Sequence, residues 1–218
     1  MNVKWLGHSC FLITDSNGVR VLTDPYAPET GRRLHDIEAD IVTVSHHHFD
    51  HDYVAAARGD FAVFDREGKY ERKGVIIEGF KTHHDAERGK RRGDNIAFKL
   101  TMDSISVLHC GDLGHVLDDD AAQRIGRVDV LLVPIGGTFT IDYAQAREVA
   151  NKLGPKVVIP MHFKTPKSAI NALDGLENFI SHVANCAIHR LNQSEASLYP
   201  NSLGDDRVLV LDTDEGEE

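Results

Sequence analysis

The first third of the chain is a succession of short apolar runs separated by polar turn residues. The runs at 3–7, 10–14 and 19–23 are rich in β-branched and aromatic residues, a composition typical of β-strands. The stretch DSNG at 15–18 lies between the second and third runs and contains residues that favour a tight turn. The pattern therefore predicts an antiparallel meander that leads into a further strand at 40–45.

The middle of the chain continues this strand-rich pattern after one helical interruption. Residues 52–58, DYVAAAR, are typical of a short helix with Asp52 as its N-cap. Strands are predicted at 61–64, 75–80, 95–101 and 104–109. A tight turn at Met102 and Asp103 is expected to join the last two.

The second half alternates continuous apolar runs with helical periodicity. Helices are predicted at 119–126, 141–154 and 168–184, and strands at 128–134, at 156–161 and within the tail at 207–218. Strands that are apolar at every position and alternate with helices indicate a sheet buried on both faces. The whole pattern predicts one α/β domain, residues 1–218, in which two mixed sheets pack together with helices outside.

Net charge limits the class of partner. The chain of 218 residues has a formal net charge of -10 at pH 7. This charge argues against nucleic-acid binding, because proteins that hold polyanions by long-range attraction usually have a basic face. The basic run ERGKRRG at 87–93 is interpreted as a solvated, glycine-bounded loop rather than as a phosphate-binding element.

The cysteines and the N-terminal stretch indicate a cytoplasmic protein. Cys10, Cys110 and Cys186 are odd in number and lack the spacing of a disulfide framework, which fits a reducing compartment. The stretch MNVKWLGHSCFLI contains a histidine among its apolar residues and no small-residue cleavage site, so it does not resemble a signal peptide. No segment approaches the roughly 18 apolar residues that a spanning helix requires.

The stretch SHHHFDHD, directly after the apolar run DIVTV, contains the ligand types of a metal site. In an extended segment residues two apart point the same way, so His46 and His48 can reach one ion while His47 points elsewhere. A turn after them would bring Asp50 and His51 to a second ion about 3.5–4 Å away. A surface histidine cluster and an adventitious metal binder are the alternatives, and the position at the end of a buried strand favours the metal site.

This H-x-H-x-D-H pattern after a strand resembles the metallo-β-lactamase superfamily. Three later segments fall where that family has its remaining ligands: THHD at 82–85, HCGD at 109–112 and VIPMHF at 158–163. With WLGHS, LTDP, GDLGH and PIGGTFT they resemble the branch of small metal-dependent hydrolases that includes ascorbate 6-phosphate lactonase and the N-acylphosphatidylethanolamine phospholipases. The resemblance extends over nearly the whole chain and implies a four-layer αβ/βα sandwich.

The resemblance also implies a dinuclear metal site. One metal would be held by His46, His48 and His84 and the other by Asp50, His51 and His162, with Asp112 between them. His84 is preferred to His83 because it directly precedes an aspartate, as in the relatives. His83 remains open, because neighbours on an extended chain point to opposite sides.

An all-imidazole first metal favours zinc. Oxygen-reducing diiron relatives have a glutamate at the position of His48, so the resemblance implies two divalent ions other than redox iron, zinc first, with manganese or nickel as alternatives. Antibiotic-degrading relatives use a cysteine on the second metal. Here His51 takes that role, and Cys110 is interpreted as a small buried residue.

Further residues are candidates for positioning ligands or contacting substrate. Asp24 is expected to accept a hydrogen bond from a ligand histidine, with an ordinary turn aspartate as the alternative. His8 is a candidate substrate contact or a buried histidine satisfied by backbone groups. His115 is a candidate proton donor to a leaving group, or a loop cap. Thr138 and Thr140 are candidates for lining the pocket.

These residues predict a hydrolase. Two ions that share a water lower its pKa from near 16 to about 7, which produces a bridging hydroxide able to attack a carbonyl or phosphoryl centre. Asp112 would hold the ions apart and Asp50 would orient the nucleophile. The expected substrate is a small phosphoester, ester or lactone, and a basic loop folded over the cleft would favour phosphate. A metal-binding or sensing protein without turnover is the alternative, and a homo-oligomer is compatible with the sequence.

Overall fold

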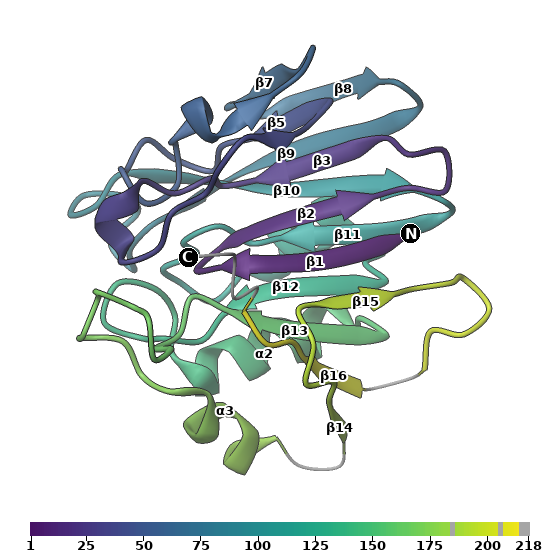
Figure 1. Ribbon diagram of the computed structural model, residues 1–218. Coiled ribbons are helices and arrows are strands. Elements are labelled where there is room, and N and C mark those ends of the chain that lie inside the picture. Colours follow the sequence, from purple (N-terminus) through teal and green to yellow (C-terminus); the bar gives the residue numbers. More distant parts are fainter. Residues whose placement is uncertain (184–185, 205–206, 214–218) are drawn as a thin grey trace.

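Two β-sheets pack face to face in the computed structural model, which describes residues 1–183, 186–204 and 207–213 (Figure 1). A third sheet has only two strands, β4 (Ile37–Glu38) and β6 (Ala57–Arg58). Both large sheets contain parallel and antiparallel neighbours. The predicted α/β sandwich of two mixed sheets is therefore confirmed.

The first sheet has six strands. Their order across the sheet is β15 (Glu195–Ser197), β1 (Asn2–Gly7), β2 (Cys10–Thr14), β3 (Arg20–Thr23), β5 (Ile41–Thr43) and β7 (Ala62–Phe64). The predicted antiparallel meander is confirmed in β1, β2 and β3, and β5 joins β3 in parallel. The chain that leaves β3 therefore emerges at the same end of the sheet as the chain that leaves β5.

The second sheet has eight strands. Their order across the sheet is β14 (Ala187–Arg190), β16 (Arg207–Val210), β13 (Val157–Met161), β12 (Val130–Pro134), β11 (Ile105–His109), β10 (Asp94–Met102), β9 (Val75–His83) and β8 (Gly68–Arg72). From β11 through β14 the neighbours are parallel. Because parallel strands point the same way, the C-terminal ends of β11, β12 and β13 lie at the same end of the sheet.

The sequence pattern missed strands at the sheet edges. β8, β14 and β15 are all edge strands, and most of their side chains are exposed. An edge strand with a solvated face needs no apolar run, so hydrophobic patterning does not detect it. In the predicted tail strand, only β16 is observed, and residues 214–218 lie outside the described part of the chain.

The helices predicted at 119–126 and 141–154 are confirmed as α1 (Asp119–Ile125) and α2 (Tyr143–Leu153). The side chain of Asp142 accepts hydrogen bonds from the backbone of Ala144 and Gln145, which satisfies the first amides of α2. α2 contacts β12 and lies between α1 and α3 (Leu176–His182). Across residues 1–183, 186–204 and 207–213, none of the helices has the length and apolar character needed to cross a bilayer.

The predicted helix at 52–58 is wrong. Only the single 3-10 turn η2 (Val54–Ala56) is present, and its N-cap residue is Tyr53 rather than Asp52. The Tyr53 amide donates to the carbonyl of Pro25 at 2.8 Å. The residues after the turn pair with β4 as strand β6. Hydrogen bonds to other segments before and after η2 therefore prevent a second helical turn.

The predicted helix at 168–184 is correct only in its second half. α3 begins at Leu176, and residue 184 lies outside the described residues. Before α3 the backbone bonds to distant loops: Ala169 donates to the carbonyl of Thr30 at 3.0 Å and Asp174 to that of Gly136 at 2.8 Å. These amides donate to partners far away in the sequence and are not available for helical hydrogen bonds. The apolar spacing at 168–175 therefore does not produce a helix.

Two apolar clusters hold the layers together. The larger joins the two sheets and includes the fully buried Trp5 and Phe11 from the first sheet and Phe98 from the second. The smaller covers the outer side of the first sheet, where Tyr26 and the 3-10 turn η1 (Pro28–Thr30) belong to the covering segment. The outer layer on this side is therefore made of loops and 3-10 turns, because the segments after β3 and β5 are extended.

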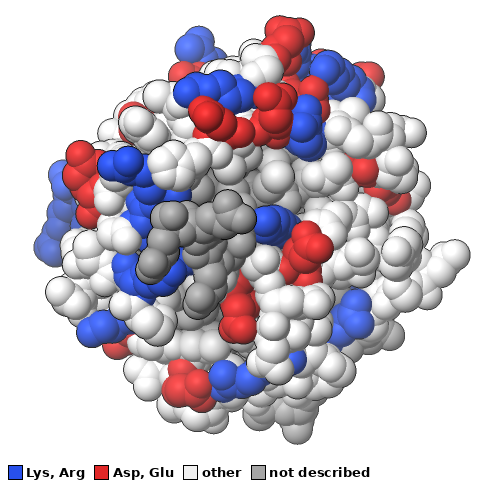
Figure 2. Space-filling model, in the orientation of Figure 1, with Lys and Arg blue, Asp and Glu red and all other residues white. Residues whose placement is uncertain are grey.

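Charged side chains of both signs are intermingled on the face shown in Figure 2. At the start of β5 the carboxylate of Asp40 is paired with Lys73 at 2.6 Å and accepts a hydrogen bond from the Arg20 amide at 2.8 Å. Because basic side chains of this kind are paired with acidic ones, the face shown in Figure 2 is not basic, as expected for a net charge of -10.

Asp129 fixes the register of β11 against β12. Its carboxylate accepts hydrogen bonds from the amide of Ser106 at 3.0 Å and from the Ser106 hydroxyl at 2.8 Å, and it pairs with Arg127 at 2.7 Å. Burial by itself would raise the pKa of Asp129, but the hydrogen bonds from Ser106 and Arg127 outweigh burial and lower it. The ionised carboxylate is thus the form that the fold stabilises.

We expect Asp129→Asn to lower the free energy of unfolding at pH 7 by about 1–2 kcal/mol, because a charged hydrogen-bonded group is lost. The folded-state pKa is below the unfolded value of about 3.9, so the stabilisation is present above that pH and disappears as the pH falls through the folded-state value. Urea titrations at pH 7 and at about pH 3 should therefore give a smaller difference between wild type and variant at the lower pH. Asp119→Asn, which removes an exposed partner of Lys152, is the control and should leave the urea midpoint close to that of wild type at both pH values.

Candidate metal centre

The candidate ligands all follow the ends of strands. His46, His48, Asp50 and His51 lie in the turn after β5, and His84 follows β9 directly. Asp112 lies three residues after β11, and His162 follows β13. Since these strands end at the same side of the sandwich, residues from position 46 to position 162 meet at its loop-bearing end, on the left in Figure 1.

The carboxylate of Asp112 is the centre of the cluster. Its Oδ2 lies 3.3 Å from the Nε2 of His84 and 3.3 Å from the Nε2 of His162. Its Oδ1 lies 3.2 Å from the Nε2 of His51, and the Nε2 of His46 lies 4.0 Å from Oδ2. Asp112 is 2% exposed. Four imidazoles therefore face one buried carboxylate.

The ligand atoms fall into two groups joined by this carboxylate. Each group has its ligand atoms within 4.8 Å of one another: the first is His46, His48 and His84, and the second is His8, Asp50, His51 and His162. A third set of His46, His51 and Asp112 connects them. The structure thus brings together all seven ligands expected from the sequence and adds His8.

The structure distinguishes between His83 and His84. His84 is buried and faces Asp112. His83 points to the other side of β9, where its Nδ1 lies 3.1 Å from Asp94. His47 is likewise directed away, and its exposed ring lies 3.5 Å from Asp52. The alternation of side chains along an extended chain separates each of these histidines from its neighbours.

The donor atoms fit a divalent cation. Within the described residues, neither the Nε2 of His51 nor the Oδ1 of Asp112 has a hydrogen-bond partner, although only 3.2 Å separates them. Such buried, unpartnered polar atoms are costly unless something else satisfies them. Imidazole nitrogen and carboxylate oxygen are ligands of zinc and similar ions, so a cation between these atoms would satisfy both.

Protonation states also favour a cation here. Burial, and then the nearby His51, lower the pKa of His46 to about 3, so this ring is neutral at pH 7 with a lone pair available. Burial would lower the pKa of His51, but Asp112 and Asp24 on its two sides raise it well above its ordinary value. The space between these carboxylates therefore favours positive charge, and metal binding there would displace a proton.

Asp24 supports two of the histidines. Its Oδ2 lies 2.8 Å from the Nδ1 of His51 and accepts a hydrogen bond from the Ser45 hydroxyl at 2.6 Å. The same hydroxyl lies 2.9 Å from the Nδ1 of His46. The Nε2 atoms of both rings are thereby directed toward Asp112, which is the supporting geometry expected for Asp24 from the sequence.

His8 lies against Asp50 rather than apart from the site. Its Nε2 is 3.2 Å from the Oδ2 of Asp50, and its ring centroid is 4.2 Å from that of His162. Its carbonyl accepts hydrogen bonds from the Trp5 indole at 3.0 Å and the His162 amide at 3.1 Å. These two backbone contacts fix His8, so its ring can hold the Asp50 carboxylate in place.

Three residues of the site have left-handed backbone conformations. The φ angles of His8, Asp24 and His162 are 51°, 40° and 50°. Residues other than glycine adopt this region at a cost of order 1–3 kcal/mol, and such positions cluster at functional sites. Each of the three is an expected ligand or contacts one, which supports a functional role for this end of the sandwich.

A cleft of about 520 Å³ opens over the cluster. Five of the expected ligands line it: His48, Asp50, His84, Asp112 and His162. Its other walls are Phe49, Phe139, Ile170, Arg91 and Arg92. The expectation that the basic run 87–93 is simply solvated is therefore wrong for Arg91 and Arg92, two of its three arginines. The basic run was the feature of the sequence that could have indicated these two cleft residues. No feature of the sequence indicated that Phe49, Phe139 and Ile170 would line the cleft.

Thr138 and His115 do not take the roles expected of them. The Thr138 hydroxyl donates to the carbonyl of Ala172 at 2.7 Å, and its neighbour Phe139 lines the cleft instead. The Nε2 of His115 accepts from the His83 amide at 3.3 Å, which leaves its Nδ1 to donate to the carbonyl of Val116 at 2.9 Å. With both nitrogens bonded to backbone, His115 matches the loop-cap alternative and is absent from the described residues that line the cleft.

Comparison with known proteins gives a consistent result. The family model described as "Beta-lactamase superfamily domain" matches residues 2–162. A "UPF0173 metal-dependent hydrolase" from Methanoregula boonei is 28% identical over 225 residues, with 93% of this chain and 100% of the relative covered. One of the same name from Carboxydothermus hydrogenoformans is 32% identical over 194 residues, with 76% and 85% covered. A crystal structure of a metallo-beta-lactamase superfamily protein from Thermotoga maritima is 35% identical, with a TM-score of 0.78 and 96% and 98% covered.

Proposed function

The chain belongs to the metallo-β-lactamase superfamily and is a metal-dependent hydrolase, and from this premise we propose that it works with two divalent cations. One cation would be held by His46, His48 and His84 and the other by Asp50, His51 and His162, with Asp112 between the two. The observation that supports this proposal most strongly is the buried carboxylate of Asp112 facing the Nε2 atoms of imidazoles from both groups.

When bound by these residues, divalent cations would supply Lewis acidity and would lower the pKa of a water in the cleft to about 7, so that hydroxide would be available at neutral pH. The protein's contribution is to hold the ligands and to orient the reactants. The Oδ2 of Asp112 lies near His84 of the first group and near His162 of the second, and its Oδ1 lies near His51 of the second. From this position Asp112 would set the separation between the two ligand groups. Asp50 lines the cleft, and its Oδ2 lies 3.2 Å from the Nε2 of His8. These contacts support the proposal that its carboxylate accepts a hydrogen bond from the attacking water.

The proposed substrate is a small phosphoester, ester or lactone, because the cleft of about 520 Å³ is the size of small-molecule sites. Zinc is the proposed metal, with manganese or nickel as alternatives, since the ligands are nitrogen and oxygen atoms. We propose a cytoplasmic location because Cys10 and Cys110 are buried free thiols and the three cysteines lack the spacing of a disulfide framework.

Elemental analysis of the purified protein, combined with a substrate panel, tests this function. We expect about two divalent ions per chain and hydrolysis of either bis-p-nitrophenyl phosphate or members of an ester and lactone panel. Protein that contains no transition metal would contradict the metal site. Full metal content without turnover on any substrate would instead support a binding or sensing protein.

We expect Asp24→Asn to weaken metal binding by about ten- to a hundredfold, because the His51 ring loses the carboxylate that fixes its tautomer and orientation. Competitive titration of zinc against a chelating dye measures this change. Asp40→Asn is the matched control, since Asp40 precedes β5 and pairs with Lys73 away from the cluster. Equal metal affinities for wild type and Asp24→Asn would show that Asp24 does not support the ligand.

A further inference from the structure

The loop at 86–93 is organised by one carboxylate. Asp85 is buried, and its Oδ1 accepts hydrogen bonds from the amides of Glu87 at 2.7 Å and Gly89 at 2.9 Å. Its Oδ2 accepts from the amides of Arg91 at 2.9 Å and Arg92 at 2.8 Å. Four backbone amides therefore converge on a side chain directly after the proposed ligand His84. The loop that follows that ligand is a built structure rather than a loose connection.

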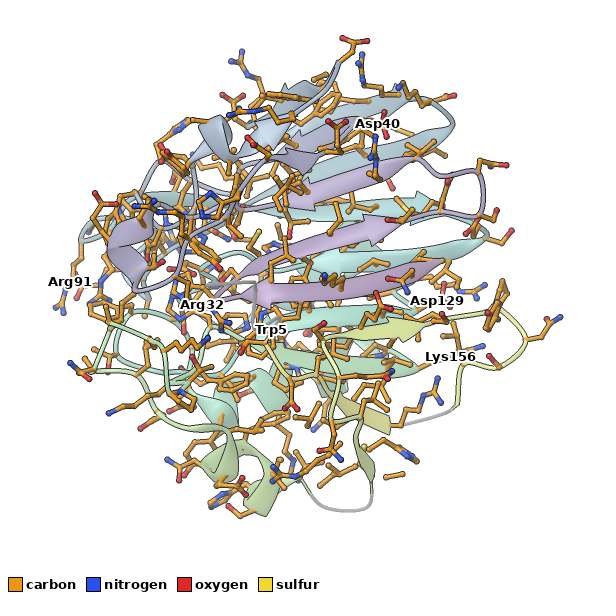
Figure 3. The ribbon with its side chains drawn as sticks, viewed as in Figure 1. Trp5, Arg32, Asp40, Arg91, Asp129 and Lys156 are labelled. Atoms are coloured by element: carbon orange, nitrogen blue, oxygen red, sulfur yellow. The ribbon has the colours of Figure 1, made fainter. Side chains whose placement is uncertain are left out.

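This loop places two guanidinium groups in the wall of the cleft. Arg91 and Arg92 line the cleft together with His84 and Asp112. The Arg92 guanidinium lies 5.2 Å from the centroid of the Phe139 ring, a cation–π distance. The Arg91 side chain is 70% exposed and is paired with Glu87 of its own loop. Figure 3 shows Arg91 at the loop-bearing end of the sandwich, opposite the end that carries Asp129.

The cleft also has an apolar wall. Phe49 lies between the site residues His48 and Asp50 and is 54% exposed, although its carbonyl is fixed by a hydrogen bond from Ala27 at 2.9 Å. Phe139 and Ile170 line the same cleft. An aromatic ring held beside a candidate metal site yet left open to water gains free energy when an apolar ligand covers it.

We propose that this cleft takes an amphiphilic anionic substrate, whose oxyanion is bound by Arg91 and Arg92 and whose hydrocarbon part packs against Phe49, Phe139 and Ile170. A guanidinium matches the geometry of phosphate and carboxylate with paired hydrogen bonds, and both are oxyanions of this kind. The proposal rests on the proposed hydrolase function, since it assigns the substrate class of the same cleft. Asp85 is a positioning residue, because it acts through the backbone of the two arginines.

Binding of simple ligands to the metal-loaded protein tests the recognition separately from turnover. We would titrate hexyl phosphate, hexanoate and hexanol by isothermal calorimetry into wild type and into the double variant Arg91→Gln/Arg92→Gln. Wild type should bind at least one of the two anions about tenfold or more tightly than hexanol. The double variant should lose about ten- to a hundredfold in affinity for that anion. The tighter of hexyl phosphate and hexanoate identifies the oxyanion.

Lys90→Gln is the matched control, since it removes one positive charge from the same loop at an exposed residue outside the cleft lining that the described residues form. It should change anion affinity by less than about twofold, as expected for a screened surface charge. Asp85→Asn keeps the size of the side chain but accepts at one atom only. It should therefore weaken anion binding as the double variant does, while elemental analysis shows its metal content unchanged.

Anion affinity that is within twofold of wild type in the double variant would overturn the proposal, and so would equal losses in the double variant and in Lys90→Gln. Hydrolysis gives an independent measure: the ratio of kcat/KM for mono-p-nitrophenyl adipate to that for p-nitrophenyl hexanoate should fall about tenfold or more in the double variant. If no ester is hydrolysed but the arginine-dependent binding is present, the hydrolase function fails while the recognition stands.

Discussion

Asp112→Ala is expected to remove most of the bound metal and to lower hydrolysis by at least about a thousandfold, which corresponds to about 4 kcal/mol of lost transition-state stabilisation. Asp112 contacts both ligand groups, with 3.2 Å to His51 and 3.3 Å to His84. Its removal leaves buried imidazoles facing one another without the negative charge that lets cations bind between them. Elemental analysis and kcat/KM on the best substrate of the panel measure the two effects.

The matched control for this variant is Asp129→Asn, which also alters a buried carboxylate but at the opposite end of the sandwich from Arg91 (Figure 3). We expect it to lower stability while metal content and kcat/KM stay near those of wild type. If Asp112→Ala keeps two ions per chain, Asp112 is not needed for metal binding. If its hydrolysis falls by no more than a few-fold, Asp112 is not needed for turnover.

Removal of the metal is expected to stop hydrolysis and to lower the melting temperature by about 10 °C. A ligand present at about a thousand times its dissociation constant stabilises the folded state by about 4 kcal/mol, and each kcal/mol shifts the Tm of a chain of this size by about 2–4 °C. The physical reason is that His51 Nε2 and Asp112 Oδ1 are buried without partners among the described residues. Thermal unfolding and activity would be measured before and after dialysis against a chelator.

Restoring zinc, manganese or nickel one at a time should recover activity and Tm together and would identify the preferred ion. Asp112→Ala should show little change in Tm on chelation, because its site is already impaired. Full activity in protein shown by elemental analysis to be free of metal would exclude metal-dependent hydrolysis at this site.

Local patterns predicted the features that depend on local physics. The meander of β1, β2 and β3 follows from apolar alternation interrupted by a turn, and α2 follows from apolar spacing, although its cap Asp142 was not predicted. The metal-ligand turn from His46 to His51 could be recognised because its residues are close in sequence and their directions follow from extended geometry. The later ligands needed the family resemblance, since nothing local connects His162 to that turn.

Other features depend on contacts between distant segments. The helix predicted at 168–184 is shortened because Ala169 and Asp174 bond to loops far away in the sequence. The position of His115 after Asp112 left a proton donor and a loop cap equally open, and its two nitrogens are bound to backbone groups, as a loop cap requires. The spacing of apolar residues along the chain does not indicate which backbone groups of one loop will bond to a side chain of another.

The sequence by itself therefore determined the inner strands of the two large sheets, the helices α1 and α2, and the ligand turn from His46 to His51, because periodicity and ligand spacing act over a few residues. With the family resemblance it also determined the class of fold and the later candidate ligands. Only the tertiary structure decided that Asp112 lies among four imidazoles, that His8 joins them, and that Arg91 and Arg92 turn toward the cleft. The direction of a loop depends on which acceptors its backbone amides find. Here the amides of Arg91 and Arg92 donate to the buried carboxylate of Asp85.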